Sequence, residues 1–96
     1  MLHFDLKDLR VFSAVALTGT VTKAAEYIHL SPSATSDRLS DLEERVGTRL
    51  FRRSSRGLRM TEAGEVFAES AKRILLEAEA LETRLAPFAH AQEKRV

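Results

Sequence analysis

Residues 20–47 of the chain, TVTKAAEYIHLSPSATSDRLSDLEERVG, decide the fold. Thr20 is a helix-start residue, and Ser31-Pro32 is a stronger start signal, because Ser caps a helix end and Pro fits the first helical position. Gly47 is typical of the residue that follows the last turn of a helix. Two helices joined by so short a link predict a helix-turn-helix.

The residues on the N-terminal side add one helix to this pair. Asp5 and Asp8 predict a weak capping box, and apolar residues recur at helical spacing from Leu6 to Ala16. Gly19 is placed to end this helix. The sequence thus predicts a first helix that packs against the helix-turn-helix.

On the C-terminal side the hydrophobic period changes. Leu50-Phe51 is apolar and is expected to fill the core, whereas residues 54–57 predict a turn. Residues 58–60 alternate between apolar and polar side chains, as a strand does. We therefore expect a small β-hairpin, and a mainly all-α fold in which residues 1–61 form a winged helix-turn-helix.

A long helix follows, with Thr61 as its cap. Its apolar residues are spaced alternately by four and three positions, the a/d pattern of a dimerisation helix, here over residues 62–88. The alternative is a helix packed on its own domain, but a domain of about sixty residues is too small to cover the whole stripe. Pro87 is expected to end or kink the helix, and residues 89–96 to form a disordered tail. The predicted dimer interface consists of Phe67, Ala71, Ile74, Ala78, Leu81, Leu85 and Phe88.

The net charge of +1 conceals an uneven distribution. Residues 1–61 hold ten Lys and Arg against seven Asp and Glu, whereas residues 62–96 hold five against seven. Within residues 49–59 there are five arginines and no acid. Such a patch indicates either a polyanion that meets one face of the protein or a solvated arginine-rich loop.

Several classes of function are excluded or disfavoured by composition. The chain has no cysteine, which removes disulfides, thiolate metal sites and cysteine nucleophiles and fits a reducing cytoplasm. His3, His29 and His90 are scattered, so we expect neither a metal nor a cofactor. No apolar run is long enough to span a membrane, and no nucleophile–base pair or phosphate loop predicts an enzyme.

Residues 6–67 resemble the N-terminal DNA-binding domain of LysR-type transcriptional regulators, and the last third resembles the linker helix of that family. Each motif alone is weak, but their order and spacing are specific. The matching residues are Leu9 and Phe12, residues 19–25, Leu30-Ser31, Ala34, Ser36, Leu42-Glu43, Gly47, residues 50–53, Arg56-Gly57 and residues 61–64.

The resemblance implies a bacterial transcription factor that acts in the cytoplasm at the nucleoid. It implies a homodimer whose linker helices pair antiparallel, bound to an interrupted inverted repeat of double-stranded DNA. In the family an effector domain follows the linker helix, so we expect either a piece of a longer regulator, which we favour, or a natural short form. RNA polymerase is a further expected partner of the full-length protein.

The third helix is expected to lie in the major groove with its N-terminal half toward the bases. The chain has Pro32-Ser33 where the family usually has Gln-Pro, and Asp37 where an amide or basic residue is common. Asp37 is expected to contribute to specificity, for instance by accepting a hydrogen bond from a cytosine amino group. The predicted contacts from this helix are Ser31, Pro32, Ser33, Thr35, Ser36, Asp37 and Arg38.

Phosphate contacts are expected at the start of the second helix and on the hairpin. Arg56, beside Gly57, is expected to enter the minor groove, where a narrow A·T-rich segment attracts arginine. Arg53 has an alternative role as a structural residue that ties the wing to Glu43 or to the end of the third helix. The remaining predicted phosphate contacts are Thr20, Thr22, Lys23 and Arg52.

Two further readings of the chain remain open at this point. A helical dimer whose winged fold has lost DNA binding would account for the acidic residues Asp37 and Asp41 on the third helix. A different family of winged-helix regulators is the other alternative.

Overall fold

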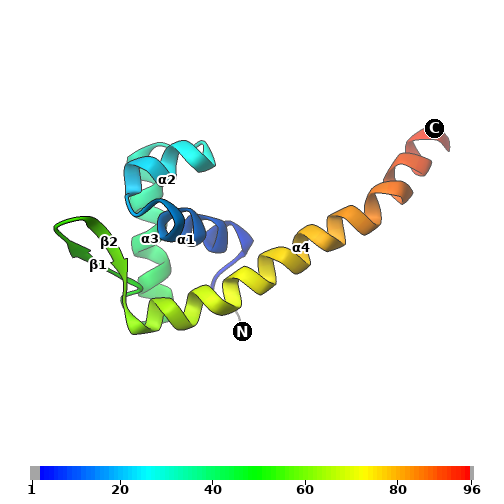
Figure 1. The fold of residues 1–96 in the computed structure, drawn as a ribbon. Coiled ribbons are helices and arrows are strands. Elements are labelled where there is room, and N and C mark those ends of the chain that lie inside the picture. The colour runs from blue at the N-terminus through cyan, green and yellow to red at the C-terminus, as the bar shows by residue number, and fades with distance from the viewer. Residues whose placement is uncertain (1–2, 96) are drawn as a thin grey trace.

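The computed structural model describes the backbone of residues 3–95 and the side chains of residues 3–89. Three helices come first: α1 (Leu6–Thr18), α2 (Val21–Ile28) and α3 (Pro32–Val46). The strands β1 (Phe51–Ser54) and β2 (Gly57–Met60) follow and pair as an antiparallel hairpin, the wing. Helix α4 (Glu62–Arg95) passes beneath α1 and then extends away from the globular part, on the side opposite to the wing (Figure 1).

The predicted helix caps are confirmed. Asp5 and Asp8 form a reciprocal capping box at α1, and the Thr20 hydroxyl accepts from the Lys23 amide at α2. Ser31 caps α3 by accepting from the Ala34 amide at 3.1 Å, with Pro32 in its first turn. Each cap satisfies a backbone amide that would otherwise lack a partner, and so fixes where the helix begins.

The core lies where α1, α2, α3, the wing and the first turns of α4 meet. Phe12 packs against both Phe51 of β1 and Phe67 of α4 with tilted rings, whose centroids are 5.0 and 4.6 Å apart. Leu42 of α3 and Leu50 before β1 are fully buried beside them. This cluster ties α3 and the wing to α1 and α4.

The wing is fastened to the turn between α1 and α2. The Leu58 amide donates to the Gly19 carbonyl oxygen at 2.8 Å. At Gly57 the backbone φ is +115°, and a Cβ there would lie 2.5 Å from that same carbonyl oxygen. Glycine is therefore required at this position both by its conformation and by the close approach.

Helix α4 differs from the expectation in two respects. It continues past Pro87 to Arg95, so the expected end at this proline is wrong for the described residues; proline removes one hydrogen bond but its φ is itself helical. Most of the predicted tail, residues 89–95, is helical, and Val96 lies outside the described residues.

The predicted dimer interface is also only partly available. Phe67 and Ala71 pack on the core of their own chain, and Phe67 contacts Phe4 and Phe12. Ala71 is 1% exposed and so is not available to a partner, whereas Phe67 is half-buried and its place in a partner interface stays a prediction. The remaining five residues, Ile74, Ala78, Leu81, Leu85 and Phe88, continue the same spacing beyond the globular part, and we call them the distal stripe.

Candidate nucleic-acid interface

The first turns of α3 carry exposed side chains. Pro32, Ser33, Ser36 and Asp37 are all exposed, as predicted for residues that face DNA. These side chains are short, so the helix backbone could approach base edges closely, and hydroxyl and carboxylate groups can exchange hydrogen bonds there. The Ser31 hydroxyl is exposed as well, although its cap to the Ala34 amide already occupies it as an acceptor.

Thr35 is a correction to the predicted contacts. Its side chain is 0% exposed, and its hydroxyl donates to the Ser31 carbonyl oxygen at 2.9 Å. A threonine can bury its methyl group while it satisfies its hydroxyl on the preceding turn, and the polar residue type alone does not reveal this. Thr35 therefore supports α3 from the inside and is not on its DNA-facing side.

The start of α2 presents two exposed polar side chains, Thr22 and Lys23. Thr20 is half-buried and holds the helix start through its bond to the Lys23 amide, at 3.1 Å. The first amides of a helix together with a lysine can hold a phosphate oxygen. The predicted phosphate contacts at α2 therefore lie together.

Four arginines are exposed on the wing. Arg52 of β1 lies directly opposite Arg59 of β2, and Arg53 lies opposite Leu58. Arg56 is in the turn, where its amide donates to the Ser54 hydroxyl at 3.2 Å. None of the four makes an ion pair within the part of the chain that the structure describes.

The pairing of Arg52 with Arg59 is significant because like charges opposite one another on a hairpin destabilise it. Arg59 was not among the predicted contacts, although its place in the cross-strand register follows once residues 54–57 are recognised as the turn. A hairpin that carries this charge has a surface suited to a polyanion rather than one optimised for its own stability.

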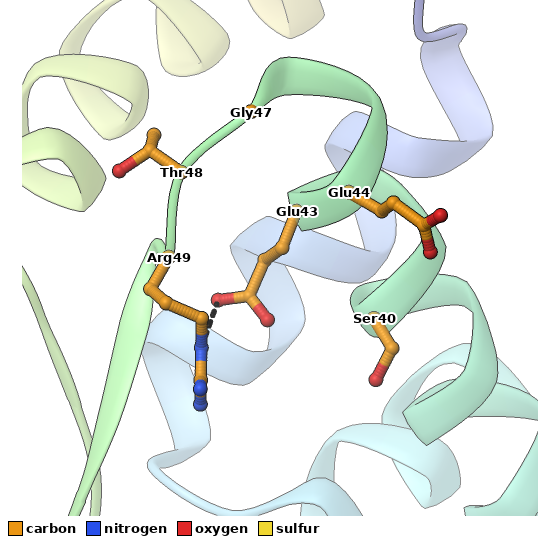
Figure 2. Close-up of a pocket in the computed structure, with 6 residues that line it drawn as sticks. All are labelled: Ser40, Glu43, Glu44, Gly47, Thr48 and Arg49. Atoms are coloured by element: carbon orange, nitrogen blue, oxygen red, sulfur yellow. Dashed lines mark ion pairs between the residues drawn. The ribbon is translucent and has the colours of Figure 1, made fainter.

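The structural alternative for Arg53, a pair with Glu43, is wrong. Figure 2 shows that Glu43 points toward Arg49 instead, with its carboxylate 3.6 Å from Arg49 Nε. The same carboxylate oxygen accepts from the Leu50 and Phe51 amides at 2.7 and 3.1 Å. Glu43 thus fixes the link between α3 and the wing through backbone groups, and Arg53 stays exposed.

Arg38 occupies a different place from the other predicted contacts. It is half-buried, and its Nη1 lies 3.7 Å from Oδ1 of Asp8 on α1. Asp8 itself is buried, and its Oδ2 accepts from Arg45 Nη1 at 2.9 Å. In the sequence Asp8 was identified only as a capping residue, since nothing local reveals a partner thirty-seven positions away.

The charge state of Asp8 follows from opposing effects. Burial alone raises the pKa of its carboxyl group, whereas hydrogen bonds from Arg45 and the Asp5 amide and the charge of Arg45 lower it. The net result is a pKa below the ordinary value for aspartate. Asp8 is therefore ionised at neutral pH, and in return it raises the pKa of Arg45.

Within the described residues, no three acidic or histidine side chains are grouped so as to hold a metal ion. No helix among the same residues combines the length and the apolar character needed to cross a membrane.

Comparison with known proteins places this arrangement in a family. Residues 6–65 match the model for the bacterial regulatory helix-turn-helix proteins of the lysR family. The chain is 48% identical over 71 residues to the transcriptional regulator BudR of Klebsiella aerogenes, and the matched segment covers 74% of the chain and 50% of BudR. It is 44% identical over 68 residues to the transcriptional regulator YofA of Bacillus velezensis, and this matched segment covers 71% of the chain and 24% of YofA. The chain thus spans half or less of the length of these curated relatives.

Solved structures agree in fold. The DNA complex of the CbnR DNA-binding domain superimposes with a TM-score of 0.80 at 35% identity, over 90% of this chain and 99% of that one. The complex of the BenM DNA-binding domain with benA site 1 DNA superimposes with a TM-score of 0.83 at 29% identity, over 90% of this chain and 97% of that one. Both of these similar chains were crystallised with DNA.

Proposed function

The chain belongs to the LysR family of bacterial regulatory helix-turn-helix proteins and has the winged helix-turn-helix DNA-binding domain of that family, and from this we propose that it recognises double-stranded DNA as a transcriptional regulator. The family consists of regulators rather than enzymes. Helix α3 lies in the major groove, and the wing follows the backbone with Arg56 in the minor groove.

The observation that carries this proposal is the presence of an arginine-rich wing together with an exposed, polar α3. Arg52 and Arg59 are paired across the hairpin without an acid between them, and Ser33, Ser36 and Asp37 are exposed on α3. Phosphate contacts supply affinity, and the side chains of α3 supply sequence discrimination. Asp37 acts in this scheme as a specificity residue, because beside a phosphate it would only be repelled.

We also propose that the DNA-bound form is a homodimer. The distal stripe is exposed in the single chain: Leu81 and Phe88, for example, are 57% and 71% exposed. A row of apolar side chains at a/d spacing is stabilised by a second helix, and antiparallel pairing would hold the two copies of α3 apart. The corresponding target is an interrupted inverted repeat, read in the bacterial cytoplasm, with RNA polymerase as a partner of a full-length regulator.

The experiment that tests the proposal uses the purified chain to select the DNA sequences that it binds from a randomised duplex library. Fluorescence polarisation then measures the affinity for the selected DNA across a salt series. We expect an interrupted inverted repeat to be selected and the affinity to fall steeply with salt, with a slope of roughly −0.9 per phosphate neutralised. Absence of binding at low salt would instead favour a protein-interaction module, for which the exposed acids Asp37 and Asp41 are the supporting feature.

A further inference from the structure

A buried carboxylate contacts α3 on its inner side, opposite to the exposed side. Asp8 of α1 is 2% exposed, and each of its two carboxylate oxygens faces a different arginine of α3. Arg45 Nη1 donates to Oδ2 at 2.9 Å, and Arg38 Nη1 lies 3.7 Å from Oδ1. The carboxylate therefore joins α1 to two separate points on α3.

These two points are spaced so that they constrain the whole helix. Arg38 and Arg45 are one heptad apart, which is two helical turns, and both project from the side of α3 that faces α1. A carboxylate held between them opposes sliding of α3 along its axis and rotation about that axis.

Asp8 is itself firmly held. Its Oδ2 accepts from the Asp5 amide at 3.0 Å in the capping box of α1. Arg45 also donates to the His3 carbonyl oxygen at 2.7 Å, so the guanidinium bridges α1 and the segment before it. The contact is thus anchored to the start of α1 rather than to a mobile side chain.

Apolar packing alone would not set this geometry. Leu39 and Leu42 also bury the inner side of α3, but the hydrophobic effect is non-directional and tolerates small rotations. Hydrogen bonds weaken with a change in angle. Recognition sites need their side chains held to within about 0.5 Å and 10–20°, so the ionic contact is the one suited to positioning Ser33, Ser36 and Asp37.

We propose that Asp8 is a positioning residue for DNA recognition: by holding Arg38 and Arg45 it fixes where α3 lies on α1, so that sequence discrimination depends on a carboxylate that does not touch DNA. The inference rests on the proposed function. It also assigns Arg38 to the interface between α1 and α3, whereas the sequence pointed to a contact with a base or a phosphate.

The surroundings of Arg38 favour a displacement when Asp8 is neutralised. Arg38 lines a hollow of about 280 Å³ together with Lys7 and Arg10 of α1, and this hollow has an apolar floor. Without the charge of Asp8, the three cations repel one another across the interface of α1 and α3. Helix α3 would then be held mainly by its apolar side.

The test compares the wild-type chain with Asp8→Asn, Arg45→Gln and the double variant. For each we would measure affinity for the selected sequence and for random DNA by fluorescence polarisation, and folding by circular dichroism. We expect each single change to lower the ratio of the two affinities by about tenfold, the discrimination that one base contact supplies. The double variant should lose no more than Asp8→Asn alone, because Asp8→Asn already removes the contact with Arg45. Affinity for random DNA and its salt slope should stay near wild type.

Glu26→Gln is the matched control, since it removes an exposed carboxylate of α2 and changes the net charge equally. A folded Asp8→Asn chain with the wild-type affinity ratio would overturn the inference and leave the proposed function standing. If Asp8→Asn does not fold, the double variant, in which Arg45 is no longer a charge without its partner, is measured in its place, and the same ratio of affinities decides. If the wild-type chain does not discriminate between sequences, the proposed function fails and this inference fails with it.

Discussion

At the scale of single residues, the wing carries charges that destabilise the hairpin and that are proposed to bind DNA. Arg52 and Arg59 face each other across the hairpin, so removal of one charge should relieve repulsion and remove a phosphate contact together. We predict that Arg52→Gln raises the free energy of unfolding by a few tenths of a kcal/mol while it makes the slope of log affinity against log salt shallower by about 0.9. Thermal unfolding and a polarisation titration series measure the two effects.

Arg73→Gln is the control for this prediction. Arg73 is exposed on α4 and its loss changes the net charge by the same amount, but we expect the salt slope to stay as in wild type. An unchanged slope in Arg52→Gln would show that the wing arginine is a solvated side chain, which is the alternative that the charge pattern alone left open.

Asp8 predicts how stability depends on pH. Its pKa in the folded chain is lowered, so its contribution is fully present above the unfolded value of about 3.9 and is lost as the pH falls through the folded value. We predict that Asp8→Asn lowers the free energy of unfolding by about 1–3 kcal/mol at pH 7, and that the difference from wild type shrinks as the pH falls below about 4. Urea unfolding of both chains at several pH values tests this, and a difference independent of pH would contradict it.

Residues such as Asp8 and Thr35 mark the limit of prediction from sequence at this scale. The caps at Thr20, Ser31 and Thr61 were predictable because a cap depends on residues within one turn. The pair of Asp8 with Arg45 depends on how α1 crosses α3, and the burial of Thr35 depends on which side of α3 meets the core. Local patterns do not contain that information.

At the scale of elements, the attachment of the wing to the α1–α2 turn leads to a further prediction. Gly57 has φ +115° and lies against the Gly19 carbonyl oxygen, so Gly57→Ala should suffer both backbone strain and a steric clash. Gly47, with φ +85° and open space around its missing Cβ, would suffer the strain alone. We predict that Gly57→Ala lowers the unfolding free energy by more than Gly47→Ala, whose cost should be about 1 kcal/mol. Equal losses, measured by urea unfolding, would mean that the wing is not held at this turn.

Helix α4 shows why an element can be predicted while its surroundings are not. The a/d spacing identified one apolar stripe, yet Ala71 is buried and Phe67 half-buried in their own chain, while most of the later residues are exposed. Periodicity reports which side of a helix is apolar, and the fold decides what covers it. Val66 is 68% exposed, whereas Ala68 and Leu75 pack against the core.

At the scale of the whole molecule, the chain is elongated, with extents of 55 × 27 × 19 Å, because the distal half of α4 leaves the globular part (Figure 1). An apolar stripe on an isolated helical extension has no core of its own. Its side chains contribute to stability only when a second surface buries them. The shape therefore supports a function that depends on two copies.

The last prediction concerns this pairing and its effect on DNA binding. Leu81→Glu combined with Leu85→Glu places two charges in the distal stripe, and we expect a monomer in analytical ultracentrifugation at concentrations where the wild-type chain is a dimer. Because the two DNA-binding domains would no longer be linked, affinity for the full inverted repeat should fall by about 10²–10⁴, while affinity for a single half-site stays the same. Val66→Glu is the control, since Val66 is also apolar and exposed, at 68% against 57% for Leu81 and 53% for Leu85, but lies outside the stripe. A double variant that still sediments as a dimer would place the interface elsewhere. If it is monomeric but binds the repeat as tightly as wild type, the two half-sites are recognised independently, and α4 is not what couples them.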